Sequence, residues 1–95
     1  MKNIYTWAAK PAKRTLTVGD LKAAKGKRKF TQVTANNVEE AEAAEKAGFD
    51  MIISNAKNVI PVREGSKNLF LTAALVLNEF VTDEDIMRGA FKALE

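Results

Sequence analysis

The amino-acid sequence predicts an α/β fold with parallel strands, and three observations lead to this prediction. Short apolar segments alternate along the chain with segments of helical periodicity. The segment Met51–Ser54 is apolar on both faces, which is typical of a strand in a buried parallel sheet. Gly48 ends the helical segment before it, so helix and strand follow one another closely. Strands that alternate with helices favour parallel pairing through crossover connections.

The amino-terminal part of the chain is strongly basic. Residues 1–15 show no clear period and contain Pro11, so we expect an extended basic arm there and a folded domain over residues 16–95. Residues 1–30 hold nine Lys or Arg against one acidic residue, a net charge of +8. Residues 31–95 hold six against eleven, a net charge of −5. The two parts should therefore attract one another, or the basic part should attract an anion.

The first expected elements are a short helix and a strand. Thr17 has the character of an N-cap, with Asp20 in the capping-box position three residues later. Gly26 supplies a stop, which predicts a helix over Val18–Lys25. The segment Phe30–Ala35 then predicts a short strand.

The next helix should lie close to the sheet. Asn36 or Asn37 can cap its start, and Gly48 ends it. Its apolar stripe consists of small side chains, which permit a close approach: Val38, Ala41, Ala44 and Ala47.

The remaining elements are a connection, a third strand and a last helix. One helical turn is expected at Val59–Glu64, followed by a strand over Leu69–Ala74. Thr82 should cap a final helix whose apolar face repeats every fourth residue, at Ile86, Ala90 and Leu94. This helix reaches Glu95 with no glycine stop and no following strand, which indicates a truncated unit.

The composition excludes several classes of function. The chain has no Cys and no His, and its two serines, Ser54 and Ser66, lack a nucleophile-elbow setting. Any chemistry would depend on Asp, Glu, Lys or Tyr. No apolar run approaches the roughly 18 residues of a membrane span, and the amino terminus lacks a signal-peptide pattern, so we expect a cytoplasmic protein with no membrane partner.

One stretch, Thr34–Met51 (TANNVEEAEAAEKAGFDM), resembles the ketopantoate hydroxymethyltransferase family of phosphoenolpyruvate- and ketoacid-binding TIM barrels. The resemblance begins at Thr17–Lys22 and Lys25–Lys27 and resumes at Val62–Asn68. It implies a partial parallel (βα) barrel, with about three βα units preceded by a short helix. These units would be the amino-terminal part of an eight-stranded barrel.

The resemblance also implies a reaction, although the residues for it are missing. The family transfers a one-carbon unit from methylenetetrahydrofolate to an α-ketoacid that magnesium polarises. The two positions of the family's metal-binding Asp residues hold Ala56 and Ala74 here, with Asn55 at the first position if the register shifts by one. The family's later catalytic residues would lie beyond Glu95. We therefore assign no catalytic residue and no metal ligand, and we expect neither magnesium nor methylenetetrahydrofolate to be a cofactor of this chain.

Three residues are candidates for weak substrate binding. Thr34 stands at the end of the first strand and matches the family motif, while Asn55 and Asn58 follow the second strand. The carboxyl ends of barrel strands are where such sites are built, so these side chains could bind a small ketoacid or another anion. The alternative interpretation is packing at the strand end for Thr34 and turn formation for the two asparagines.

Three functional hypotheses follow from these observations. The preferred one is a fragment or degenerate relative of a ketoacid-binding barrel, inactive alone, that is completed by self-association or by the missing barrel remainder, because three strands cannot close a barrel. The alternative is a small non-catalytic binding or assembly module whose basic arm engages an anionic partner such as RNA, with Lys25–Lys29, Tyr5 and Trp7 as its surface. The simpler interpretation of that basic run is a solvated face, so nucleic acid is not the expected partner. The third is a gene remnant without function.

Overall fold

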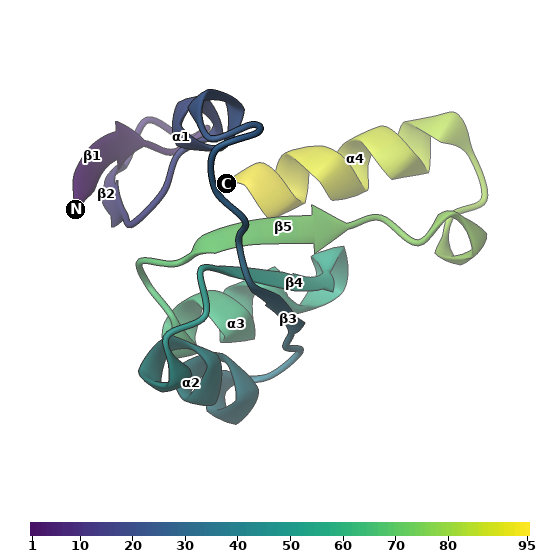
Figure 1. Cartoon of the computed structure of the whole chain (residues 1–95). Coiled ribbons are helices and arrows are strands. Elements are labelled where there is room, and N and C mark those ends of the chain that lie inside the picture. The colour runs from purple at the N-terminus through teal and green to yellow at the C-terminus, as the bar shows by residue number, and fades with distance from the viewer.

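A sheet of three parallel strands forms the centre of the fold (Figure 1). The computed structural model describes all residues from 1 to 95. Its elements, in chain order, are β1 (Lys2–Tyr5), β2 (Pro11–Arg14), α1 (Val18–Ala23), β3 (Gln32–Thr34), α2 (Val38–Ala47), β4 (Met51–Asn55), the 3₁₀ turn η1 (Ala56–Asn58), α3 (Val59–Gly65), β5 (Phe70–Ala74), the 3₁₀ turn η2 (Leu77–Glu79) and α4 (Asp83–Leu94). The predicted α/β class is confirmed.

The main sheet has the strand order β3–β4–β5, and both pairings are parallel, as predicted. Val33, Ile52 and Leu71 share a row across the three strands. The next residues along, Thr34, Ile53 and Thr72, form the adjacent row on the opposite face, because side chains alternate along a strand. The sheet therefore has one face that packs against helices and one face, bearing Thr34, that no helix covers.

The hydrophobic core lies between β4 and the helices α2 and α3. Ile52 and Val62 are its largest fully buried apolar side chains. Its other members are small or come from segment ends: Ala35, Ala41, Ala44 and Leu69. The small-residue stripe predicted for the second helix is thus confirmed at its two central positions, Ala41 and Ala44.

Helices α2 and α3 meet at Gly65. A Cβ atom added there would overlap the carbonyl oxygen of Val38 and would lie 2.9 Å from the Cβ of Ala41. Because no larger residue fits, the close approach of the two helices depends on this glycine.

The predicted caps are confirmed. Thr17 and Asp20 form a reciprocal capping box, in which the hydroxyl of Thr17 accepts from the Asp20 N–H and Asp20 accepts from the Thr17 N–H. Asn37, rather than Asn36, caps α2 by accepting from the Glu40 N–H at 2.8 Å. Gly48 ends α2 with φ of 84°, a left-handed conformation that other residues adopt at a cost.

The prediction of an extended arm over residues 1–15 was wrong. This segment forms a two-stranded antiparallel hairpin in which β1 pairs with β2. The turn of the hairpin has no Asn-Gly or Asp-Gly pair, and Ala9 adopts the left-handed φ of 59° instead. The Thr6 N–H donates to the carbonyl of Lys10, and the carbonyl of Thr6 accepts from the Ala9 N–H. Pro11 is compatible with this arrangement because it begins an edge strand.

The hairpin is attached to the loop before β5. The Thr15 N–H donates to the carbonyl of Asn68 at 2.9 Å, and the Asn68 side-chain amide donates to the carbonyl of Lys13 at 3.1 Å. The Arg14 guanidinium donates to the carbonyl of Lys67 at 3.0 Å. The basic segment is therefore part of the folded unit.

Other boundaries differ by a few residues. The first predicted helix ends at Ala23, two residues early, and the first predicted strand is limited to Gln32–Thr34. The single turn predicted at Val59–Glu64 is a seven-residue helix that ends at Gly65. None of the helices is long and apolar enough to cross a lipid bilayer.

The two serines are both buried, but only one of their hydroxyl groups forms a hydrogen bond. The hydroxyl of Ser54, on β4, has no hydrogen-bond partner. The hydroxyl of Ser66 donates to a carboxylate oxygen of Glu45 at 3.2 Å, which links the end of α3 to α2. A buried hydroxyl without a partner loses its hydration and gains nothing in return.

We predict that Gly65→Ala lowers the free energy of unfolding by about 2–3 kcal/mol, because the new Cβ would overlap the α2 backbone. Gly48→Ala is the matched control, since it meets no atom within 4 Å and should cost only about 1 kcal/mol for its left-handed backbone. Urea denaturation followed by circular dichroism measures both. Equal losses in the two variants would contradict the close contact between α2 and α3.

The two serines allow a paired test. Ser54→Ala should raise the free energy of unfolding by about 1 kcal/mol, because it removes a buried hydroxyl that has no partner. Ser66→Ala should lower it by about 1 kcal/mol, because it breaks the bond to Glu45. Thermal and urea denaturation should move in opposite directions for the two variants. A loss of stability in Ser54→Ala would show that its hydroxyl has a partner.

Candidate functional site

The carboxyl ends of β3 and β4 lie at the same edge of the sheet because the strands are parallel. An asparagine stands at or just after each of these ends: Asn36 is two residues beyond β3, and Asn55 is the last residue of β4. In α/β sheets this edge is where ligand sites are built.

Asn36 is the centre of a hydrogen-bonded cluster. Its side-chain oxygen accepts from the Asn55 backbone N–H at 3.0 Å and from the Asn58 side-chain amide at 3.1 Å. The side chain of Asn55 accepts from the Lys57 N–H at 3.1 Å and donates to Glu79 at 3.2 Å. These contacts hold the loops after β3 and β4 in one arrangement and join η2 to them.

A cavity of about 300 Å³, which we call the strand-end cavity, lies beside this cluster between η1 and α4. Asn55, Lys57, Glu79 and Lys92 supply its polar wall, and the ammonium group of Lys57 lies 3.6 Å from the carboxylate of Glu79. The apolar part of its lining is formed by Val59, Ile60, Phe80 and Ala93. The volume is at the lower end for small-molecule sites, which are commonly about 300–1,000 Å³.

The structure brings together two of the three residues predicted for this site. Asn55 lines the strand-end cavity, and Asn58 joins the same cluster through Asn36. Thr34 lies elsewhere, exposed on the uncovered face of the sheet beside Ile53.

Sequence reasoning missed four residues of the site: Asn36, Lys57, Glu79 and Lys92. Asn36 carries a usable signal, because it follows one strand as Asn55 follows the next, but its capping potential gave it another role. Glu79 lies five residues beyond the third strand and Lys92 eighteen, and no local pattern connects them to Asn55. Only the path of the chain after β5 places them there.

The side chains at this edge can bind an anion or a carbonyl group but do not fit a magnesium ion. Lysine ammonium and asparagine amide groups donate to carboxylate and carbonyl oxygens. Magnesium requires several oxygen ligands, usually with carboxylates among them. Two carboxylates reach the cluster: Glu79 is paired with Lys57, and Glu40 accepts from the Asn36 backbone N–H at 2.9 Å. No group of three or more His, Cys, Asp or Glu side chains lies together.

No protein-family model, curated protein or solved structure matches this chain. The resemblance to ketopantoate hydroxymethyltransferases therefore remains a prediction from the sequence.

We predict that Asn36→Ala lowers the free energy of unfolding by about 1 kcal/mol and speeds hydrogen exchange at the Asn55 amide, because both donors to Asn36 lose their acceptor. Asn78→Ala is the matched control, since its side chain is exposed and forms no hydrogen bond. Amide exchange by nuclear magnetic resonance measures the local effect. Unchanged exchange at Asn55 would contradict the bridging role of Asn36.

Proposed function

We propose that this chain is an assembly unit of a ketoacid-binding (βα) barrel similar to ketopantoate hydroxymethyltransferases. In this proposal it contributes three strands and one rim of the substrate site, and it is not catalytic alone. The observation that carries the proposal is the parallel sheet that helices cover on one face only.

The open borders of the sheet support this proposal. Strands β3 and β5 each pair on one side only, which leaves unpaired backbone groups along both edges. The uncovered face carries the row Thr34, Ile53 and Thr72. In a complete barrel the corresponding face is packed by layers of side chains from the other strands.

The small core supports it further. Six hydrophobic residues are buried, and three of them are alanines. Eleven large hydrophobic side chains remain exposed, among them Ile60, Leu77 and Val81. A chain of this size buries little surface by itself, so additional contacts with other strands would stabilise it.

The strand-end cavity accounts for binding but not for catalysis. Lys92 could pair with the carboxylate of a small ketoacid, and the amide of Asn55 could donate to its carbonyl oxygen. The positions of the family's metal carboxylates are occupied by Ala56 and Ala74. Binding without turnover is therefore the function expected of this chain alone.

The alternative, a basic module for RNA, has less support. The ring of Trp7 packs against Phe91, with 5.5 Å between ring centroids. Arg28 lies 4.6 Å over the ring of Phe30 and pairs with Asp50 at 2.8 Å. Trp7 and Arg28 therefore already have partners within the protein, whereas Tyr5 remains exposed.

Sedimentation velocity at micromolar concentration tests the assembly. We predict that the wild-type chain forms dimers or larger species through the uncovered face. Thr72→Lys should shift it toward monomer, because the new charge would have to be buried. Ala43→Lys is the matched control, with the same added charge on the exposed side of α2, and should leave the assembly unchanged. A well-folded wild-type monomer would contradict the proposal.

A further inference from the structure

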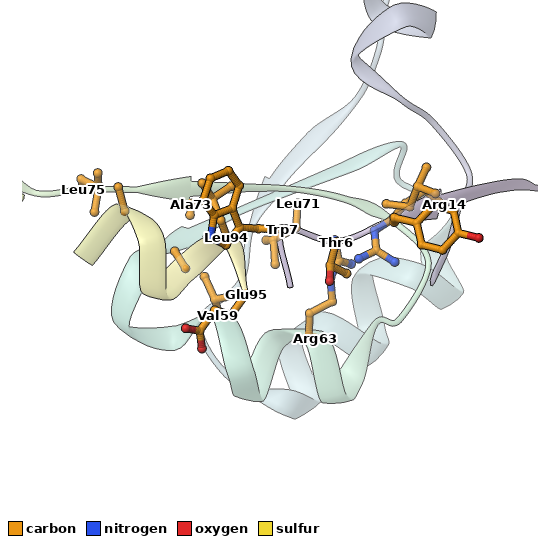
Figure 2. Close-up of a pocket in the computed structure, with 14 residues that line it drawn as sticks. Thr6, Trp7, Arg14, Val59, Arg63, Leu71, Ala73, Leu75, Leu94 and Glu95 are labelled. Atoms are coloured by element: carbon orange, nitrogen blue, oxygen red, sulfur yellow. The ribbon is translucent and has the colours of Figure 1, made fainter. Parts of the chain in front are cut away.

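A second and larger cavity lies on the helix-covered side of the sheet. Its volume is about 580 Å³, and it is lined by residues of β5, α3, the carboxyl end of α4 and the hairpin (Figure 2). Its wall is mostly apolar, with Leu71, Ala73 and Leu75 from β5, Leu94 from α4 and Trp7 from the hairpin. Because side chains alternate along β5, Leu71 and Ala73 lie on the face opposite Thr34 and Thr72. The cavity is therefore separate from the uncovered face proposed for assembly.

Two arginines break the apolar wall, and we call this space the arginine cavity. Arg14 comes from β2 and Arg63 from α3, and Figure 2 shows their guanidinium groups directed toward one another at one end of the space. Each is held by its Nη1 atom. Arg63 donates from it to the carbonyls of Ser66 and Leu69, at 3.0 and 2.7 Å. Arg14 donates from it to the carbonyls of Lys13 and Lys67, at 2.8 and 3.0 Å.

The rest of each guanidinium group is free. The Nε and Nη2 atoms of both arginines form no hydrogen bond within the protein, and neither arginine is in an ion pair. Glu95 also lines the cavity, but it lies beside Val59, away from the two guanidinium groups. Two positioned guanidinium groups therefore line a mostly apolar space, and the N–H groups at their Nε and Nη2 atoms remain free to donate to a ligand.

The electrostatics of the pair favour an anion. Burial, together with the nearby charge of Arg14, lowers the pKa of Arg63 to about 10, although Glu45 opposes the shift. Burial also lowers the pKa of Arg14. Both groups remain cationic at neutral pH, and a bound negative charge would relieve their repulsion.

We propose that the arginine cavity binds a small amphiphilic carboxylate, with the carboxylate between Arg14 and Arg63 and the apolar body along β5 and Trp7. The proposal does not depend on the assembly function. A planar guanidinium matches the two oxygens of a carboxylate, and the apolar wall favours a hydrocarbon body over a fully hydrated anion. The cavity volume lies within the range of small-molecule sites, about 300–1,000 Å³.

Octanoate is the probe, titrated into the full chain by calorimetry and by the fluorescence of Trp7, the one tryptophan. Binding should change the Trp7 emission, because the apolar body lies against that ring. 1-Octanol and octylamine have the same chain with a neutral or a cationic head, and we expect them to bind at least about tenfold more weakly. Equal binding of octanol would overturn the role of the arginines.

Three variants locate the site. Arg14→Met keeps an unbranched side chain and removes the charge, so octanoate affinity should fall about tenfold or more. Ala73→Leu fills the cavity and should weaken octanoate and octanol alike. Lys13→Met is the matched control, because Lys13 is an exposed neighbour on β2 outside the cavity, and it should bind as the wild type does.

Thermal denaturation of each variant shows that it is folded before its affinity is compared. If a folded Arg14→Met or Ala73→Leu variant bound octanoate as tightly as the wild type, the proposal would be wrong. The absence of binding to the wild-type chain would also overturn it, whatever the outcome of the sedimentation experiment.

Discussion

The contact between α2 and α3 over strand β4 is the interaction on which the rest of the structure depends. At Gly65 the two helices approach so closely that no side chain fits between them. This approach buries Ile52 and Val62 and gives the sheet its one covered face. Because α3 begins directly after η1, the same contact fixes the position of the asparagine cluster at the strand ends.

A sheet covered on one side has two different environments, and each of them suits a different kind of partner. The uncovered face and the edges of β3 and β5 present unpaired backbone and partly exposed side chains, which suits association with further strands. The covered side is incompletely filled, since a cavity of about 580 Å³ remains between β5, the seven-residue helix α3 and the hairpin (Figure 2). The arginine cavity is the result, and the two guanidinium groups give it a preference for negative charge.

The sequence was most informative where a local pattern determines local structure. The caps at Thr17 and Thr82 and the stop at Gly48 fall where they were predicted, because a hydroxyl or a glycine acts within one helical turn. The hairpin at residues 2–14 was missed because its turn uses a left-handed Ala9 in place of the usual glycine. Hydrogen bonds to Lys67 and Asn68, far along the chain, attach it to the rest of the fold. In the same way Asn55 could be proposed from its place after a strand, whereas Glu79 could not.

The sequence by itself determined the alternation of strands and helices and the parallel pairing of the strands. Those properties depend on periodicity, capping and residue type within a few positions of one another. Only the tertiary structure decided which distant groups meet: Arg14 with Arg63 in one cavity, and Asn36 with Asn58 at another. These contacts depend on how β2 and the loops pack against the sheet, and no pattern within a few residues of the sequence predicts that packing.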